Sequence, residues 1–334
     1  MTELAAPAGL ASGPDGSADV VIVCVTHNST GVIEPFLESM APALAGLPRC
    51  RVVIVDNDSR DGTGALVRRR APWASVVDSG RNAGYAGGIN AALRAHRPRV
   101  GAYVLNPDTV PGPGSVKALV DAAARNPSVG IAVPQMLSTS GTPVSSLRRE
   151  PTIARALGEA VVGGTLASRL AAIGETVPAG SGYPDGARAD WATGAALYIP
   201  KETLQLVGEW DERYFLYSEE TDYCLRVRDA GLQVRLVATA RVTHHGGDQS
   251  VAPALWAISA VNRTRLYRAR HGRWASRAYW SAVLFNEALR SGRDTQTHRT
   301  AVRALLAAGP DRPGAEDTLQ LLADAGVPLL HHAP

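Results

Sequence analysis

The chain has 334 residues, 45% of them apolar, and a formal net charge of +3 at neutral pH. This length fits one large domain or two smaller ones, and the apolar share is ordinary for a globular protein with a buried core. So small a charge does not favour nucleic acid as a partner, because such partners are attracted by a strongly positive field. We therefore expect a globular protein that does not bind nucleic acid.

The three cysteines are Cys24, Cys50 and Cys224, which are widely spaced and form no CxxC pair. This pattern favours neither a disulfide framework nor a zinc site, and it indicates a reducing, cytoplasmic setting. Cys24 lies within an apolar run and is expected to be a small core residue.

Residues 1–18 are rich in Ala, Gly and Pro and contain no Lys or Arg. They lack the basic start and the apolar centre of a signal peptide, so we expect a flexible leader. We also expect no membrane-spanning segment, because the apolar stretch from Ile153 to Ile173 is interrupted by charged residues.

Short apolar strands alternate with helical patterns in the first half of the chain. The expected strands are Val20–Val25, Arg51–Val55, Ser75–Asp78, Ala102–Leu105 and Gly130–Val133. The expected helices are Val32–Ala45, Gly62–Arg70, Tyr85–Ala95 and Gly114–Arg125. This alternation predicts an α/β fold with a mostly parallel central sheet flanked by helices. Ligands of such sheets bind outside the carboxyl ends of the strands.

The second half is less regular. Residues 138–189 surround one helical stretch and form either a flexible acceptor-side segment or an insertion. Further on, we expect strands at Ala196–Ile199 and Val234–Val237, a helix at Glu219–Ala230, and helices from about Val251 onward.

Acidic residues follow two of the expected strands. Asp56 ends the second strand, where its carboxylate could accept hydrogen bonds from a nucleobase or a ribose, or could form an Asx turn or a helix cap. Asn106-Pro107-Asp108 ends the fourth. Two oxygen-bearing side chains suit Mg²⁺ or Mn²⁺, although an Asx-Pro turn has the same sequence.

A glycine-rich segment, residues 82–88 (NAGYAGG), opens the third helix. Free N–H groups at a helix start favour anions, so a diphosphate is a natural ligand, and a purely structural turn is the alternative. The segment lacks the spacing of a Walker loop or of a dinucleotide fingerprint.

Two polar clusters lie near the end of the expected α/β region. Residues 218–222 (SEETD) begin a helix, either as a cap with acids favoured by the helix dipole or as the source of a general base. His244 and His245 follow a strand and could reach a metal or a phosphate, or be structural.

Arginines alternate with aromatic residues from Trp256 to Arg293. Such helices can rest on an anionic membrane surface or hold a lipid diphosphate. They can equally be amphipathic helices with a packed aromatic face, or the contact of a homodimer. The sequence leaves these alternatives open.

The order and spacing of these motifs resemble glycosyltransferase family 2, and among its members the bacterial rhamnosyltransferases. The resemblance covers about residues 19–272. It is carried by residues 26–28 (THN), 55–59 (VDNDS), 82–88 (NAGYAGG), 105–108 (LNPD), 193–196 (TGAA), 211–215 (DERYF), 219–226 (EETDYCLR) and 244–247 (HHGG).

The resemblance implies a GT-A fold with a helical C-terminal extension. It divides the chain into a leader at 1–18, a catalytic domain at 19–250 and a helical region at 251–334. Within the catalytic domain, residues 19–136 would bind the nucleotide sugar and residues 137–250 would form the acceptor and catalytic half. The implied reaction is an inverting single displacement, in which a sugar moves from a nucleoside-diphosphate donor to an acceptor hydroxyl.

The resemblance also implies residue roles. The donor nucleotide would contact Thr26, Asn28, Asp56, Asn82, Gly87, Asn106 and Asp108. A divalent cation, Mg²⁺ or Mn²⁺, would be held by Asp108 and His244. The catalytic group would comprise Glu220, Glu219 and Asp211, and the acceptor cleft would be lined by Trp191, Thr193, Gly194 and Asp222.

Two positions depart from the family pattern. Asn106 replaces the first acid of a strict DxD motif, and Glu220 stands where an aspartate base is usual, so Glu219, Glu220 and Asp222 all remain candidates for the base. The donor would be a dTDP- or UDP-sugar, with rhamnose the leading candidate. The acceptor would be a glycolipid, a glycan or a small secondary metabolite, reached from the cytoplasm or from the inner face of the membrane. A sugar-nucleotide-binding protein without turnover and a nucleotidyltransferase are the alternatives.

Overall fold

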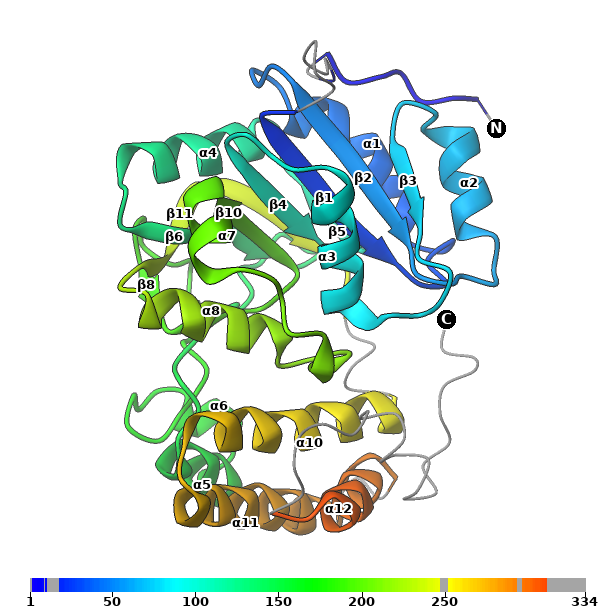
Figure 1. Cartoon of the computed structure of the whole chain (residues 1–334). Coiled ribbons are helices and arrows are strands. Elements are labelled where there is room, and N and C mark those ends of the chain that lie inside the picture. Colours follow the sequence, from blue (N-terminus) through cyan, green and yellow to red (C-terminus); the bar gives the residue numbers. More distant parts are fainter. Residues whose placement is uncertain (1, 9, 11–17, 247–251, 293–295, 311–334) are drawn as a thin grey trace.

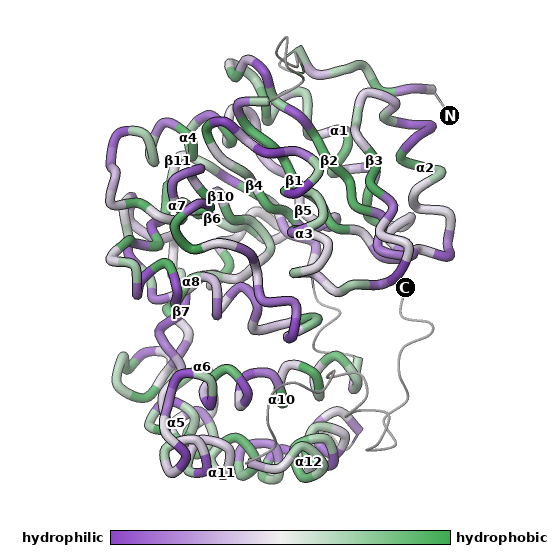
Figure 2. The backbone as a smooth tube through the Cα atoms, in the orientation of Figure 1, coloured by the Kyte–Doolittle hydropathy of each residue, from purple (hydrophilic) through white to green (hydrophobic). Residues whose placement is uncertain are grey.

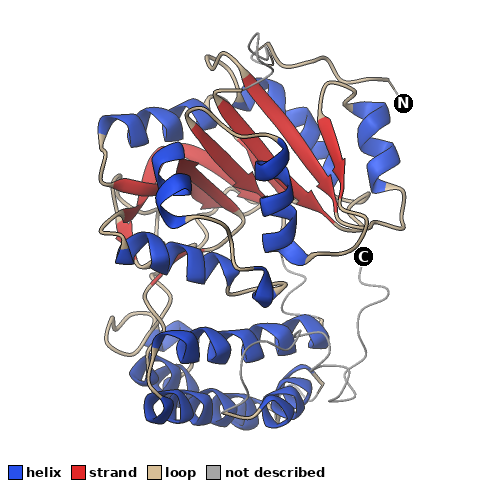
Figure 3. Cartoon of the chain, in the orientation of Figure 1, coloured by secondary structure: helices blue, strands red, loops and turns tan. Residues whose placement is uncertain are grey.

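The computed structural model describes residues 2–8, 10, 18–246, 252–292 and 296–310. Its main part is a large sheet with helices on both faces (Figure 3). A further group of helices lies below this α/β part in the view of Figure 1. The predicted α/β architecture with a helical C-terminal region is therefore confirmed.

The strand order in the sheet is β3-β2-β1-β4-β10-β6-β11-β5. Parallel pairing joins β1 (Val20–Thr26), β2 (Cys50–Asp56), β3 (Ser75–Asp78) and β4 (Gly101–Leu105), and separately joins β6 (Val129–Leu137) to β11 (Gln233–His244). Antiparallel pairing includes β10 (Ala196–Pro200) and β5 (Thr109–Pro111). Because β10 runs against β4, its first residue, Ala196, pairs with Leu105. The loop that enters β10 therefore lies at the carboxyl edge of the parallel strands.

Each face of the sheet carries its own hydrophobic core. One core packs against α1 (Ile33–Ala43), α2 (Thr63–Arg70) and α4 (Ser115–Arg125), and the other against α3 (Gly84–Ala95), α7 (Lys201–Val207) and α8 (Glu219–Asp229). Successive side chains of a strand point to opposite faces, so Ile22 and Cys24 join the first core while Val21 and Val23 join the second. A strand buried on both faces reads as a continuous apolar run, which Figure 2 shows along the sheet. The expected burial of Cys24 is confirmed.

Several short elements were not predicted. These are β5, α7, the antiparallel pair of β7 (Leu147–Arg148) and β9 (Trp191–Ala192), and β8 (Arg188–Ala189), which pairs with β11. Strands of two or three residues contain too few side chains to show an alternating pattern. β11 is also longer than expected, because a register shift between Val237 and Arg241 separates it into two apolar parts.

The helical region consists of α10 (Pro253–Arg270), α11 (Arg273–Arg290) and α12 (Thr297–Ala308), together with α5 (Ile153–Val162) from the middle of the chain. Ala156 of α5 belongs to the same buried cluster as Val261, Tyr279 and Leu305. α6 (Gly164–Ala167) follows α5 directly. The helical region is therefore built from two separate chain segments, and a boundary at residue 251 leaves out one of them.

Most aromatic rings of the basic stretch pack inside this region. Tyr267 stacks on Tyr279 with ring centroids 4.0 Å apart, and Trp256 donates a hydrogen bond of 2.9 Å to Glu287. Arg263, which is half-buried, pairs with Glu175 at 3.0 Å. Trp274, by contrast, is 76% exposed. The packed-face alternative thus accounts for much of the pattern. Within the described ranges, no helix combines the length and apolarity that crossing a membrane requires.

The described part of the expected leader contacts the α/β part. The Leu4 backbone N–H donates to the carbonyl oxygen of Arg70 at 2.8 Å, and the indole of Trp73 donates to the Leu4 carbonyl at 3.1 Å. Residues 1, 9 and 11–17, the rest of that expected leader, lie outside the described residues, as do residues 247–251, which include Gly247 and Val251.

Candidate functional site

Asp108 and His244 meet at the carboxyl edge of the sheet, although they lie far apart in the sequence. β11 ends at His244, which pairs with Thr109 of β5, so the histidine lies beside the loop that follows β4. His244 Nε2 is 3.1 Å from Asp108 Oδ2. Asp108 Oδ1 is buried and has no hydrogen-bond partner among the described residues. An oxygen and an imidazole nitrogen so arranged could both bind one cation.

The protein ligands for such a cation would be few. Across the described ranges, no three His, Cys, Asp or Glu side chains come together in a group that could hold a metal ion. Mg²⁺ usually keeps several waters and binds through one or two carboxylates plus substrate phosphates. The unpartnered oxygen of Asp108 and the adjacent His244 therefore fit a cation that completes its coordination with a bound ligand. The side-chain amide of Asn106 also makes no hydrogen bond to another described residue.

Glu219 and Glu220 open α8, and both have a carboxylate oxygen, Oε2, that is buried and unbonded within the described structure. Burial raises the pKa of Glu219 well above its usual range, and the neighbouring Glu220 raises it further. Burial also raises the pKa of Glu220, to about 6, while backbone N–H groups at the helix start partly oppose the rise. Two adjacent acids resist ionising together, so the pair holds a proton more tightly than two separate carboxylates would.

Three elements converge on Glu220. A Cβ atom at Gly194 would lie 3.2 Å from Cβ of Glu220 and 3.5 Å from the Tyr85 ring, so the loop entering β10 packs directly on both. The Tyr85 hydroxyl donates to the Gly194 carbonyl at 2.9 Å. Burial raises the pKa of Tyr85 first, and the charges of Glu219, Glu220 and Asp108 add to the rise. The tyrosine hydroxyl is thus close enough to the acids of α8 and to the acid that follows β4 for their charges to act on it.

Thr193 adds another unpartnered group to this region. Its Oγ1 is buried and bonds to no other described residue, while its backbone N–H donates to the carbonyl of Ser146 at 3.0 Å. Buried polar atoms in native proteins are nearly always hydrogen-bonded. Unpaired oxygens of Thr193, Asp108, Glu219 and Glu220 therefore mark a place where a polar ligand would complete the bonding.

The loops after β1 and β2 lie side by side. Asp56 accepts a hydrogen bond from the Ser59 N–H at 3.0 Å, which is the Asx-type turn considered from sequence. Asn28, at φ = 50°, accepts from the Arg60 N–H at 2.9 Å. Thr26 is fully buried and donates to the Val55 carbonyl at 3.0 Å. Thr26 therefore supports this loop pair, whereas Asp56 and Asn28 are partly accessible.

Buried Asn57 holds the glycine-rich segment, a role not recognised from the sequence. Its Nδ2 donates to Asn82 Oδ1 at 2.9 Å and to the Gly84 carbonyl at 3.0 Å, and its Oδ1 accepts from the Ala83 N–H at 2.9 Å. Asn82 Oδ1 also accepts from the Gly84 N–H, at 3.1 Å. Asn82 was expected to contact a ligand, but its side-chain oxygen Oδ1 already accepts two hydrogen bonds within the loop.

The start of α3 differs from the expectation of free N–H groups. The Tyr85 N–H donates to the Phe215 carbonyl at 2.8 Å, and the N–H groups of Ala83 and Gly84 are bonded to side chains. These three donors are not available to an anion. Gly84, at φ = +75°, is required here because a Cβ atom would lie 2.1 Å from the Phe215 oxygen. Gly87 packs against the Ala83 side chain, where a Cβ would approach within 2.7 Å.

Asp211 and Asp222 are both paired with arginines. Asp211 accepts from the Arg213 side chain at 2.5 and 2.9 Å. Burial opposes ionisation of Asp211, but the Arg213 hydrogen bonds outweigh it and lower its pKa. Asp222 pairs with Arg226 at 2.7 Å. A separation of two residues turns a side chain about 200° around a helix, which puts Asp222 opposite Glu220. Neither aspartate joins the carboxylates at Glu219 and Glu220.

Trp191 lies on the β7–β9 pair, opposite Arg148. Its indole donates to the Arg149 carbonyl at 3.0 Å, and the Arg148 guanidinium lies 5.8 Å from the ring centroid. Burial lowers the pKa of Arg148, and the charge of Glu175 is the largest influence that opposes this fall. Next to this pair is a hollow of about 370 Å³ whose basic lining residues are Arg148, Arg149, Arg188 and Arg228.

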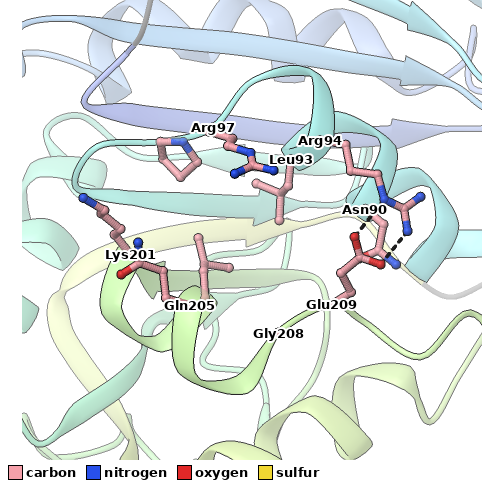
Figure 4. Close-up of a pocket in the computed structure, with 10 residues that line it drawn as sticks. Asn90, Leu93, Arg94, Arg97, Lys201, Gln205, Gly208 and Glu209 are labelled. Carbon is pink, nitrogen blue, oxygen red and sulfur yellow. Dashed lines mark hydrogen bonds and ion pairs between the residues drawn. The ribbon is translucent and has the colours of Figure 1, made fainter.

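A second hollow, of about 330 Å³, lies between α3 and α7 (Figure 4). Its lining includes Arg97 and Lys201, and Arg94 at one side is paired with Glu209 at 2.5 Å. Pro200, just before Lys201, pairs with Gly101, the first residue of β4, so this hollow lies toward the amino end of that strand. It therefore lies at the opposite edge of the sheet from the carboxylate cluster.

The sequence of this chain matches the model of one known protein family. The model of glycosyl transferase family 2 matches residues 21–171. An N-acetylglucosaminyl-diphospho-decaprenol L-rhamnosyltransferase, found in two strains of Mycobacterium tuberculosis, is 30% identical over 282 residues. Those residues are 79% of this chain and 87% of the relative.

Two solved structures share the architecture. A mannosyltransferase from Pyrobaculum calidifontis, PcManGT, in complex with GDP-Man and Mn²⁺, has a TM-score of 0.51, with 16% identity over 96% of this chain and 90% of its own. GalNAc-T7 with UDP, GalNAc and Mn²⁺ has a TM-score of 0.54, with 11% identity over 87% of this chain. This chain covers 57% of that longer protein. At such identities the likeness shows the fold, which is GT-A.

Replacing Asn57 tests the hold on the glycine-rich segment. Asn57→Ala leaves buried donors and acceptors without partners, so we expect the free energy of unfolding to fall by about 1–3 kcal/mol. Urea unfolding measures it. Asn126→Ala is the control, because the side chain of Asn126 accepts hydrogen bonds only from Ser128, near the start of β6, among the described residues. Equal stability of Asn57→Ala and the unmodified protein would contradict the assigned contacts.

Proposed function

We propose a mechanism from one premise: this chain belongs to glycosyltransferase family 2 and transfers a sugar from a nucleotide sugar. In the proposal, the reaction is an inverting single displacement in which Glu220 takes the proton of the acceptor hydroxyl. The observation that carries it is the pair of carboxylates at the start of α8, each with one buried, unpartnered oxygen. The loop that enters β10 packs against Glu220.

The pKa values of the two glutamates support Glu220 as the base. A general base works best when its pKa is near the working pH and it is unprotonated. The pKa of Glu220 is raised by burial only to about 6, whereas that of Glu219 is raised further. A pKa of about 6 leaves Glu220 able to accept a proton at neutral pH. Asp222 is bonded to Arg226 and is not the base in this proposal.

The donor would lie along the carboxyl edge, with its nucleoside near Asp56 and Asn28 and its diphosphate near Asp108. Asp108 and His244 would hold a divalent cation there, with Asn106 beside them. When bound, such a cation supplies positive charge against the leaving diphosphate. Because the first N–H groups of α3 are already bonded within the protein, we assign the diphosphate to Asp108 and His244 rather than to that helix start.

For the acceptor, we propose an anionic, lipid-linked sugar, and for the donor dTDP-rhamnose. The name of the mycobacterial relative supports both, since it gives a decaprenyl-diphosphate acceptor and an L-rhamnosyl group that is transferred. The arginine-lined hollow beside Trp191 supports an anionic group on the acceptor. Exposed apolar side chains also gather on neighbouring helices. They are Leu157, Val161 and Val162 on α5, Leu166 on α6, and Phe285 and Leu289 on α11.

Glu220→Gln tests the base. The change keeps the shape of the side chain and removes its ability to accept a proton, so turnover should fall by about 10²–10⁴-fold. Donor affinity, measured by calorimetry, should be retained. Glu219→Gln is the matched control, because glutamine mimics a protonated glutamate, and its loss should stay below about tenfold. Normal turnover by Glu220→Gln would refute the assignment.

The pH dependence follows from the same carboxylate. A base must be unprotonated, so kcat/KM should fall about tenfold per pH unit below the raised pKa of Glu220 and level off above it. A pH–rate profile from about pH 5 to about pH 8 measures it. A flat profile through the region near pH 6 would argue against Glu220.

Metal dependence tests Asp108 and His244. Chelation should abolish turnover, and Asp108→Asn should raise the Mn²⁺ concentration for half-maximal activity by about tenfold or more, a difference of about 1.4 kcal/mol in binding. Asp58→Asn, at an exposed acid after β2, is the control. Full activity of the chelated protein would remove the cation from the proposal.

Vesicle binding tests the lipid-linked acceptor. Val161 is 71% exposed, and Val161→Glu should weaken sedimentation with vesicles that contain anionic lipid by about threefold or more, because it adds a charge to an apolar face. Leu206→Glu, on α7, is the control at a comparably exposed leucine. Binding that is unaffected by Val161→Glu and by anionic lipid content would contradict a membrane-facing acceptor.

A further inference from the structure

The segment Tyr214–Ser218, here called the bridging loop, leads directly into Glu219 and Glu220. Its backbone is unusual for residues other than glycine, since Phe215, Tyr217 and Ser218 have φ of 62°, 65° and 75°. Phe215, with ψ = −62°, forms a γ-turn, in which the Leu216 N–H donates to the Tyr214 carbonyl at 2.7 Å. This turn is rare and strained, and such conformations persist only when their surroundings hold them.

One side chain from the helical region supplies most of that hold. Asn262 of α10 is fully buried, and its Nδ2 donates to the carbonyls of Tyr214, Leu216 and Tyr217 at 2.6, 2.9 and 3.2 Å. The remaining carbonyl of the turn, that of Phe215, accepts from the Tyr85 N–H at the start of α3. The bridging loop is thus fixed from one side by α10 and from the other by α3.

Apolar packing reinforces the same contact. Leu266, one helical turn beyond Asn262, is buried with Tyr214 and with Leu225 of α8. Leu216 and Tyr217 pack against the core of the helical region. Figure 1 shows α10 as the helix of this region that lies nearest to α8. α10 therefore contacts the bridging loop and α8 together.

We propose that Asn262 is a positioning residue for the transfer reaction, which sets the place of Glu220 by holding the bridging loop in its strained conformation. This inference rests on the proposed function of Glu220. It gives the helical region a role in the chemistry itself. Without the amide of Asn262 the carbonyls of Leu216 and Tyr217 lose this donor, and that of Tyr214 keeps the Leu216 N–H but loses its bond to α10. The loop then relaxes to a conformation that displaces the first turn of α8.

The test replaces Asn262 by leucine, which has nearly the same shape but no N–H group. Leucine is also the better helix former, so α10 is not weakened by the change. A displacement of about 1 Å at a reacting group can cost about 10²-fold in rate, so we expect kcat to fall by about 10- to 100-fold. Donor affinity should change less than about threefold, because Asn262 touches no residue assigned to the nucleotide.

A second readout separates positioning from a general structural role. If the bridging loop relaxes, Glu220 becomes more accessible to water, and the acid limb of the kcat/KM profile should move to lower pH, toward the ordinary pKa of a glutamate. Loss of stability alone would not move this limb. Asn286→Leu is the matched control, since Asn286 is likewise buried in the helical region, on α11, but makes no hydrogen bond to the bridging loop among the described residues.

The outcomes are distinct. A lower kcat with donor affinity kept and the acid limb moved, for Asn262→Leu and not for Asn286→Leu, supports the proposal. A kcat within twofold of normal, or an equal loss in both variants, overturns it. If Asn262→Leu does not fold, Asn262→Ser, which keeps one donor, is measured by the same criteria. A separate measurement tests the proposed base: full turnover by Glu220→Gln would show that Glu220 is not the base.

Discussion

The burial of two adjacent carboxylates at the first turn of α8 is the constraint on which the rest of the site depends. An ionised carboxylate that lacks some of its hydrogen bonds is costly to bury, so the surrounding chain must hold these groups in place while leaving one oxygen of each unpaired. The loop that enters β10 does this from one side, since Gly194 has no side chain to interfere with Glu220. The bridging loop does it from the other. The two large cores on either face of the sheet offset this cost. The result is a carboxylate whose ionised form is destabilised, so that it accepts a proton readily.

The same edge of the sheet brings charge together from distant parts of the sequence. Asp108 follows β4 and His244 ends β11, and the antiparallel pairing of β5 with β11 brings them to 3.1 Å. Tyr85 bonds to the Gly194 carbonyl, and the charges of both Asp108 and the α8 glutamates act on its hydroxyl. The donor and acceptor halves of the site are therefore not independent units, because one tyrosine and one glycine connect them.

The sequence predicts the parts of this arrangement that depend on local pattern. Alternating strands and helices put Asp56 and Asp108 at strand ends, and the acids of residues 218–222 at a helix start, as the structure shows. The sequence does not predict the direction of β10, because a buried apolar run of five residues is compatible with both parallel and antiparallel pairing. Nor does it predict the roles of Asn57 and Asn262, since a buried asparagine is defined by the carbonyls it contacts, and these come from distant segments. The glycine-rich segment misleads for a related reason: its N–H groups look free in the sequence and are bonded in the fold.

A crystal structure of the protein with dTDP and Mn²⁺ would test the central claim most directly. The account predicts the diphosphate and the cation at Asp108 and His244, the thymine beside Asp56, and the carboxylate of Glu220 facing the space next to the terminal phosphate. A nucleotide bound instead in the hollow between α3 and α7, with Asp108 and His244 still bonded only to each other, would contradict it.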